Sequence, residues 1–589
     1  MRRVTVENLS LPEAEGSESH RPKASDSRSR TSRDARGLVT LLATVGATCF
    51  AGSAWAFSSA SPEPYMDEVF HVPQAQAYCR GEFDSWDPKI TTPPGLYVFA
   101  LAYARLAAFA QEALPPLFWA ATSRADGAHE WCPAGSLRQV NWAFSLGTLA
   151  VMRALLARRM APRKALAHAL LLWLYPVSFF FSFLFYTDPG ATFLVLLCYL
   201  LATGRPRGGG WGRRFGSALA GGMSVLFRQT NAVWVAFTLA VCLLEDFTPS
   251  VVIAAASPDR SREASRPPLS TPTTTRRRKK HAHDRVSPGS KTPTAAIGEP
   301  RHSGGSIADG GSDVDRGNVD TSSPPTSVPS PHLPPVPRLL LSLAGAALSD
   351  ARRGAPLLRA RAPLAVPVVL FAAFVWGFNG GAVVVGDKEN HSPGGPPHLA
   401  QLAYLAAVGA SLWGVVGGRE ALLGRDARRG FARWAAGTGV VGVAAVVAGV
   451  AAGLWRYSLA HPFLLSDNRH YPFYVWRRLL SRACVRVALS PIYVFCGWMM
   501  ASRLLRRRPP LWVLSYAGAA AVVLVPSPLV EPRYLTIPVL LAHLESAERS
   551  WKSLAVGVIT CSAVNAMTVY VFLARPFVWH DGSLARFMW

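Results

Sequence analysis

The chain has 589 residues and a formal charge of +25, and half of its residues are hydrophobic while only 16% are charged. Soluble globular domains carry about 25% charged residues, and the apolar residues here form long blocks without a helical or strand period. The composition therefore argues against an ordinary soluble protein, a collagen, a coiled coil and, with 8 cysteines, a small disulfide framework.

The N-terminal region divides at about residue 36. Residues 1–36 are rich in Ser, Arg and Glu and have no apolar period, which predicts a disordered cytosolic tail. The block from Gly37 to Phe57 is about 21 residues long, enough to cross a hydrocarbon core of ~30 Å. Because the basic stretch RSRTSRDAR precedes this block, we predict a retained signal anchor with its N-terminus in the cytosol.

Later apolar blocks predict an all-α polytopic membrane protein with about 13 transmembrane helices, within a range of roughly 12 to 14. The predicted spans are 137–157, 165–185, 187–203, 213–229, 231–247, 363–385, 398–418, 433–455, 484–502, 510–526, 531–545 and 553–573. Several are short or contain Pro and Gly, which is typical of broken helices around a polar site. The run from Gly95 to Ala110 predicts a helix on the membrane surface.

The basic loops give a test of the topology. If the first span leaves the cytosol and each later span alternates, the Arg-rich loops near 158–164, 205–214, 419–429 and 503–508 are all cytosolic, as the positive-inside rule requires. Five polar segments then share the opposite side: PYMDEVFH (64–71), FYTDP (185–189), FRQTN (227–231), DNRHY (467–471) and EPRY (531–534). Charged residues so close to a bilayer favour a functional site.

Residues 248–362 form a separate block rich in Ser, Pro, Thr and Arg, which predicts a disordered basic cytosolic insert. Its run RRRKKH (276–281) suggests nuclear import or nucleic-acid contact. In a multi-span protein a solvated loop is the simpler interpretation, so we expect no nucleic-acid partner. The two parts of the transmembrane domain are then residues 37–247 and 363–589.

The long non-cytosolic loop 58–136 contains the leading candidates for chemistry. Asp67 and Glu68 are adjacent, and neighbours on a helix point about 100° apart, so we expect one to face a site and the other a structural partner. A solvated loop without chemistry is the alternative on spacing alone. Cys79 and Cys132 lie in the same loop, where an oxidising compartment allows cysteines to pair.

A second candidate site lies at 461–482, where cations and aromatic residues are interspersed. Arg469, His470 and Arg477 offer donors for phosphate oxygens, and the aromatic faces suit a sugar ring or an isoprenoid chain. Asp467 belongs to the same cluster. An interfacial belt of aromatic and Arg anchors is the alternative. Three isolated cations are weaker candidates of the same kind, namely Arg533, Lys388 and Arg228.

The segments PYMDEVFHVPQAQAYC (64–79) and WDPKITTPPGLY (86–97) resemble the dolichyl-phosphate-glucose-dependent alpha-1,2-glucosyltransferases, which complete the lipid-linked oligosaccharide for N-glycosylation. Four more segments support this resemblance: FRQTNAVWV (227–235), GDKENH (386–391), SDNRHYPFYVWRR (466–478) and RPFVWHDGSLARFMW (575–589). The resemblance covers residues 37–247 and 363–589. The Ser/Arg-rich tail, the long insert and the SPGGPP run after GDKENH depart from the family pattern.

The resemblance implies a C-type glycosyltransferase architecture in the endoplasmic reticulum membrane, with a lumenal active site in the loop 58–136. It implies that the third, terminal glucose passes from dolichyl phosphate glucose to Glc2Man9GlcNAc2-PP-dolichol with inversion. The expected partners are therefore this donor, the dolichyl-diphosphate-linked oligosaccharide acceptor and the lipid bilayer. No cofactor and no metal are expected.

Site residues also follow from the resemblance. Because superfamily members place an acidic residue in the first lumenal loop, Asp67 is the leading general base and Glu68 the reserve. Arg469 and His470, with Arg477 and Arg533 behind them, are expected at the phosphate. Three other classes stay open: a sibling transferase with another donor or acceptor, a lipid or ion transporter, and a noncatalytic membrane scaffold.

Overall fold

The computed structural model describes residues 24–113, 132–204, 210–256, 351–388, 396–546, 549–579 and 581–589. The chain divides into two units, one formed by residues 1–251 and 340–589 and the other by residues 252–339. Of the second unit only residues 252–256 are described, as the end of a helix. The rest of the predicted insert lies outside the described residues, as do residues 1–23 of the predicted tail, and the following account concerns the first unit.

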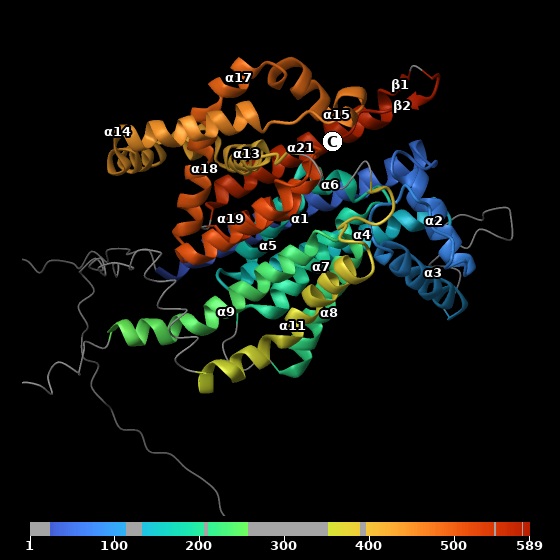
Figure 1. The fold of residues 1–589 in the computed structure, drawn as a ribbon, viewed down its shortest axis with the longest axis horizontal. Coiled ribbons are helices and arrows are strands. Elements are labelled where there is room, and N and C mark those ends of the chain that lie inside the picture. The colour runs from blue at the N-terminus through green and yellow to red at the C-terminus, as the bar shows by residue number, and fades with distance from the viewer. Residues whose placement is uncertain are drawn as a thin grey trace, which may run out of the picture. The chain divides into compact units, whose positions relative to one another are not determined.

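The described chain is almost entirely helical (Figure 1). Its helices are α1 (Ala24–Ala60), α2 (Glu68–Arg80), α3 (Gly95–Ala113), α4 (Ala134–Ala157), α5 (Pro162–Trp173), α6 (Pro176–Phe181), α7 (Thr187–Ala202), α8 (Trp211–Phe227), α9 (Asn231–Ala256), α11 (Ala351–Gly377), α13 (Ala400–Leu423), α14 (Arg425–Arg456), α15 (Pro462–Ser466), α16 (Tyr471–Val475), η2 (Trp476–Leu480), α17 (Ala483–Ala488), α18 (Ser490–Leu505), α19 (Pro510–Leu524), η3 (Pro532–Leu535), α20 (Thr536–Glu545) and α21 (Trp551–Ala574). Two short antiparallel strands follow, β1 (Phe577–Val578) and β2 (Leu584–Ala585).

Five helices within the described residues are long and apolar enough to cross a membrane. They are Ala35–Ala60, Ala134–Ala157, Arg359–Gly377, Arg425–Arg456 and Trp551–Ala574. Shorter apolar helices, including Thr187–Ala202 and Pro510–Leu524, lie between them. The predicted class, a helical polytopic membrane protein, is thereby confirmed, whereas the number of about 13 spans stays a prediction.

Helix ends depart from the predicted boundaries in two places. α1 begins at Ala24, inside the segment for which we predicted a disordered tail, and α11 begins at Ala351, inside the predicted insert. The extension of α11 is rich in Ala and Arg, and that of α1 contains several Arg; both residue types have high helix propensity, which favours continuation of the helices beyond their apolar blocks. The predicted surface segment at Gly95 is a helix, α3.

Proline breaks the predicted span 165–185 close to the site. α5 ends at Trp173, and Pro176 opens the short helix α6 at its first position, where the missing N–H costs nothing. The chain then turns through residues 182–186 before α7 starts at Thr187. The break thus leaves an irregular, aromatic-rich segment between α6 and α7, as expected beside a polar site between helices.

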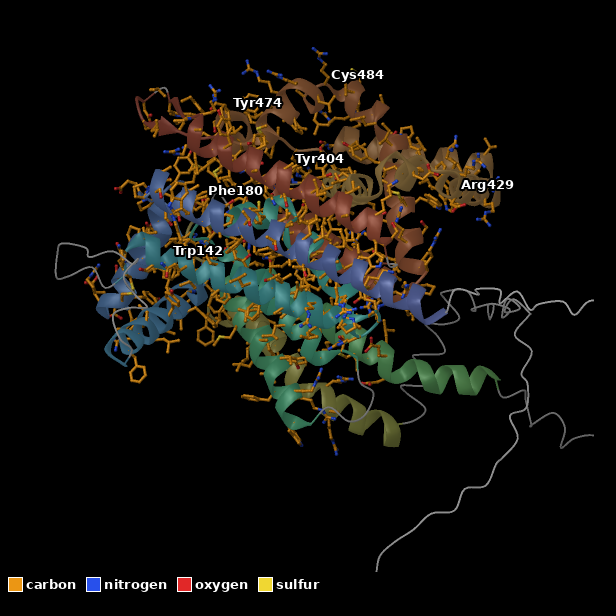
Figure 2. The ribbon with its side chains drawn as sticks, turned by 180° about the vertical axis from the view of Figure 1, so that it is seen from behind. Trp142, Phe180, Tyr404, Arg429, Tyr474 and Cys484 are labelled. Carbon is orange, nitrogen blue, oxygen red and sulfur yellow. A yellow bond between two sulfur atoms is a disulfide. The ribbon has the colours of Figure 1, made fainter. Side chains whose placement is uncertain are left out.

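Aromatic packing holds the N-terminal and C-terminal helices together. The ring of Phe57 on α1 stacks on Phe572 of α21 with centroids 5.0 Å apart, and it lies 5.8 Å from Phe180 of α6. Figure 1 shows α1 beside α21, and Figure 2 shows Phe180 among the ribbons while Cys484 lies at the periphery. Because α1 and α21 lead into the loop at residue 61 and the segment at residue 575, this packing brings both toward the same site.

Candidate active site

A polar cavity of about 480 Å³ lies where the five polar segments of the sequence meet, and its volume is within the usual range for small-molecule sites. It is formed by the start of α2, the α6–α7 junction, the residue after α8, the segment 463–472, η3 and the end of the chain. Its acidic, basic and histidine lining residues are Asp67, His71, Lys89, Arg228, Asp387, Asp467, His470, Glu531 and Arg533.

Asp67 is the N-cap residue of α2 and faces the polar cavity. The preceding Met66 has a φ of 57°, a left-handed conformation that non-glycine residues rarely adopt and that is often found at functional sites. The backbone N–H of Asp67 donates to the Tyr186 hydroxyl at 3.2 Å. Its carboxylate accepts a hydrogen bond from Arg533 at 2.8 Å and remains 36% exposed.

The electrostatic surroundings keep Asp67 ionised. Burial on its own raises the pKa of this carboxyl group, but the charges of Arg533 and His71 and the hydrogen bond from Arg533 outweigh burial. The pKa of Asp67 therefore lies below its ordinary value of 3.8. A partly exposed, ionised carboxylate at the wall of a cavity can accept a proton from a bound hydroxyl group.

Glu68 points away from the polar cavity and is fully buried. Arg138 of α4 binds it through both carboxylate oxygens, at 2.8 and 2.6 Å, and the backbone N–H groups of Phe185 and Tyr65 donate to it at 2.6 and 3.1 Å. All the oxygens of Glu68 are thus engaged in joining three segments of the chain. The prediction that one of the two neighbouring acids has a structural partner fits this arrangement, and the reserve role of Glu68 as a base does not.

Behind Asp67 lies a chain of alternating charges. Arg533, on η3, contacts Glu531 and lies 3.8 Å from Asp188 in the first turn of α7. Asp188 in turn contacts Arg228, whose guanidinium lies 4.9 Å from the ring centre of Tyr534. The predicted cations Arg533 and Arg228 therefore meet at the site, and each is already paired with at least one carboxylate.

The predicted cluster at 467–477 is divided by the structure. Asp467 and His470 line the polar cavity, whereas Arg469 binds Asp467 through two hydrogen bonds of 2.8 and 2.7 Å and lies over Trp579. Arg477 lies on η2, is exposed and does not line the cavity. The amine of Lys388 is likewise exposed and donates to a backbone carbonyl at 3.3 Å.

Several lining residues were not among the predicted site residues. Glu531 lines the polar cavity and Asp188 lines the adjoining apolar cavity. They lie in the polar segments EPRY and FYTDP, so the prediction that these segments share one side was the signal that could have found them. Lys89 reaches the cavity because its turn packs against Gly386, whose φ of 71° and close approach to the carbonyl of Ile90 leave no room for a side chain. No sequence pattern indicated this long-range contact.

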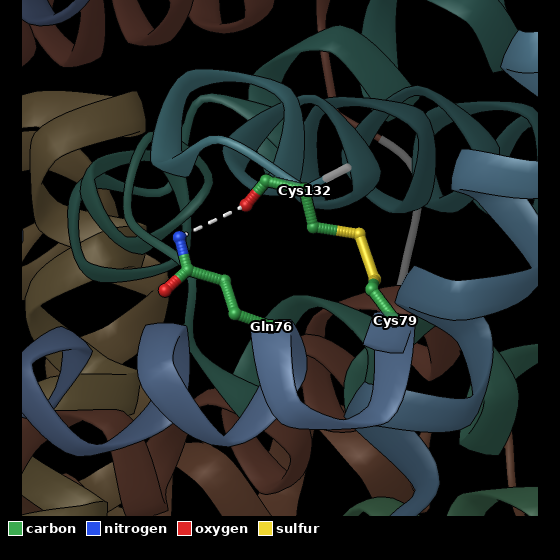
Figure 3. The surroundings of a disulfide bond; sticks show 3 residues. All are labelled: Gln76, Cys79 and Cys132. Atoms are coloured by element: carbon green, nitrogen blue, oxygen red, sulfur yellow. Dashed lines mark hydrogen bonds between the residues drawn. A yellow bond between two sulfur atoms is a disulfide. The ribbon is translucent and has the colours of Figure 1, made fainter. Parts of the chain in front are cut away.

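A disulfide bond holds α2 in place. Cys79 near the end of α2 is bonded to Cys132 before α4, and the side chain of Gln76 donates to the Cys132 carbonyl at 3.2 Å (Figure 3). The two cysteines that the sequence placed in one loop are therefore paired. On the same helix, His71 bonds to the Tyr97 hydroxyl at 2.7 Å, and burial lowers its pKa below the ordinary 6.5.

An apolar cavity of about 380 Å³ adjoins the polar one. The two share Thr91, Thr92, Arg228, Arg533 and Tyr534 in their walls. The remaining wall of the apolar cavity is mostly hydrophobic and includes Trp234, Phe371, Val522, Val523 and Ile537. A ligand with a charged head and an apolar chain fits such a pair of cavities. Within the described residues no group of three or more His, Cys, Asp and Glu side chains is placed to hold a metal.

The fold and the cavity define a helical, polytopic membrane protein with a charged site at the ends of its helices. The chain belongs to the DIE2/ALG10 family, whose sequence model matches residues 61–544. The resemblance that the sequence motifs indicated is thereby confirmed.

Curated relatives extend this similarity over most of the chain. A protein of Arabidopsis thaliana named Dol-P-Glc:Glc(2)Man(9)GlcNAc(2)-PP-Dol alpha-1,2-glucosyltransferase is 34% identical over 545 residues, or 90% of this chain and 95% of the relative. Proteins of Homo sapiens and Yarrowia lipolytica with the same name are 29% and 27% identical. They cover 91% and 94% of this chain and 95% and 97% of their own lengths. No solved structure matches the chain.

Proposed function

We propose that this chain transfers glucose from dolichyl phosphate glucose to Glc2Man9GlcNAc2-PP-dolichol in alpha-1,2 linkage, with inversion at C1. The names of the relatives support the donor, the acceptor and the linkage. The single structural observation that carries the proposal is the partly exposed, ionised carboxylate of Asp67 in a cavity that also contains cations and opens to an apolar cavity.

In this mechanism Asp67 is the general base. Its carboxylate takes the proton of the acceptor 2-hydroxyl while that oxygen attacks C1 of the donor glucose from the side opposite the phosphate. The bond from C1 to the phosphate oxygen breaks, and dolichyl phosphate leaves with the electron pair. A positioned base of this kind contributes about 10²–10⁴-fold to the rate. The hydrogen bond from Arg533 to Asp67 orients the carboxylate for this step.

Charge pairing suggests which cation receives the phosphate. Arg228 and Arg533 are partly neutralised by Asp188, Asp67 and Glu531. Lys89, also in the cavity wall, has no carboxylate partner among the described residues, and its amine is exposed 5.2 Å from the ring centre of Phe70. We therefore propose that Lys89 binds the phosphate, with Arg228 beside it and the first isoprene units in the apolar cavity.

The same proposal places the protein in the endoplasmic reticulum membrane with the polar cavity in the lumen and the N-terminus in the cytosol. The lining of one cavity by the segments at 67, 186–187, 228, 467 and 533 supports their proposed location on the same side of the membrane. The paired cysteines Cys79 and Cys132 suit an oxidising lumen. His470 stays a candidate at the sugar or phosphate, and Arg469 is proposed to hold Asp467.

The test uses purified full-length chain with dolichyl phosphate glucose and the diglucosylated lipid-linked oligosaccharide, and reads product mass and linkage. We expect a gain of one hexose in alpha-1,2 linkage and a loss of about 10²–10⁴-fold in kcat for Asp67→Asn at unchanged thermal stability. Glu82→Gln, in an exposed ion pair of the same loop, is the control. Full activity in Asp67→Asn would overturn the base assignment. No transfer by folded, unmodified protein would favour a sibling transferase or a transporter.

A further inference from the structure

The end of the chain forms part of the polar cavity. The backbone of Met588 donates to the Arg469 carbonyl at 2.9 Å and accepts from the N–H of Tyr471 at 3.1 Å. The ring of His470 bonds to the Trp589 carbonyl at 2.9 Å. Both Met588 and Trp589 line the cavity. Residues 588–589 are thus held by the segment 469–471, and both segments contribute to the wall of the polar cavity.

Further contacts join the C-terminal residues to the loop that carries Asp67. The Tyr65 hydroxyl donates to the Arg586 carbonyl at 2.9 Å and accepts from the Arg586 N–H at 2.7 Å. The guanidinium of Arg586 in turn donates to the carbonyl of Phe572 at the end of α21 at 3.0 Å. Met588 and Arg586, which precede Trp589 in the chain, are both anchored by these hydrogen bonds. The ring of Trp589 therefore has a defined position in the cavity wall and loses little freedom on binding a ligand.

Trp589 has two features suited to a sugar. Its ring packs edge-on against Tyr471, with centroids 5.2 Å apart and planes at 73°, in the cavity wall. Its indole N–H is buried and has no hydrogen-bond partner among the described residues. A buried donor without a partner is unfavourable, so a ligand hydroxyl that reaches this N–H and accepts its hydrogen bond would bind favourably. An aromatic face beside such a donor matches the C–H face and hydroxyls of a pyranose.

The position of Trp589 distinguishes donor from acceptor. The polar and apolar cavities share Arg228, Arg533 and Tyr534, which marks the side from which a lipid phosphate enters. Trp589 and His470 line the polar cavity and are not part of the wall that the two cavities share. Asp67 lines the polar cavity as well and contacts Arg533 of the shared wall. We propose that Trp589 binds the terminal glucose of the acceptor and directs its 2-hydroxyl toward Asp67, an inference that rests on the proposed function.

The experiment measures acceptor and donor KM separately for Trp589→Ala and Trp589→Phe in the full-length protein. We expect Trp589→Ala to raise the acceptor KM about tenfold or more, and Trp589→Phe, which keeps an aromatic face but lacks the N–H, to raise it less. The donor KM should stay within about twofold for both. Trp211→Phe, at a ring that is 76% exposed and lines neither cavity, is the matched control.

Binding of the acceptor without donor separates this proposal from the proposed reaction. The dissociation constant of the diglucosylated acceptor is measured in the Asp67→Asn background with and without Trp589→Phe, together with the melting temperature. Weaker binding at an unchanged melting temperature supports the role of Trp589 in binding the acceptor glucose. Unchanged binding, or an effect on donor KM alone, would overturn it. If the unmodified chain transfers no glucose but Trp589→Phe still weakens acceptor binding, the proposed reaction is wrong and the role of Trp589 in acceptor binding is supported.

Discussion

Asp67 and Glu68 are adjacent in the chain, yet their carboxylates point to different surroundings. Asp67 is partly exposed in the polar cavity and bonds to Arg533, whereas Glu68 is fully buried and bonds to Arg138. The start of α2 falls between them, because Asp67 is the N-cap and Glu68 the first helical residue. We therefore expect removal of the Glu68 carboxylate to lower mainly stability and removal of the Asp67 carboxylate to lower mainly activity.

Glu68→Gln should lower stability more than activity per folded molecule. Arg138 would then be a buried charge without a full partner, and breaking such a pair costs about 3–5 kcal/mol. We expect a large fall in melting temperature and in yield of folded protein. Glu82→Gln, in an exposed pair with Arg80, should change neither.

The double variant Glu68→Leu/Arg138→Leu tests the cause. It leaves no buried charge, so it should recover part of the lost melting temperature. Recovery is partial because the N–H groups of Tyr65 and Phe185 lose their acceptor. A double variant that is less stable than Glu68→Gln would contradict the ion-pair explanation.

Lys89 and Lys388 provide a matched pair for the phosphate site. Both are exposed, but only Lys89 lines the polar cavity. Lys89→Met should raise the KM for dolichyl phosphate glucose and lower kcat, by about tenfold or more in kcat/KM, because a charge-assisted hydrogen bond is worth about 1.5–3 kcal/mol. Lys388→Met should leave both unchanged. Equal effects of the two substitutions would show that the cavity position is not what matters.

Arg533→Gln should change the pH dependence of transfer. Burial raises the pKa of Asp67, and Arg533 is the main charge that opposes it, so removal of Arg533 should raise this pKa. Because the base acts only when ionised, the acidic limb of log kcat/KM against pH should move to higher pH. Arg477→Gln, at an exposed position outside the cavity, is the control and should leave the profile in place. An unshifted acidic limb in Arg533→Gln would show that this limb does not report the ionisation of Asp67.

Local patterns in the sequence predicted much of this molecule. Apolar blocks indicate helices in a membrane because their length and composition match the bilayer, and this requires no knowledge of the neighbours. The motifs around Asp67 and at 466–478 indicated the family, which the comparisons confirmed. The alternation of charged loops grouped five polar segments on one side, and residues from all five line the polar cavity.

Only the tertiary structure decided which residues in those segments face the cavity. Charge type is the same for Arg469, Arg477 and Arg533, but only Arg533 lines the polar cavity. The turn around Lys89 contacts Gly386, and Trp589 and Met588 contact residues 469–471, in each case more than 100 residues away in the sequence. Hydropathy and motif spacing report on local structure, whereas the orientation of a side chain depends on contacts between distant segments that no single segment encodes.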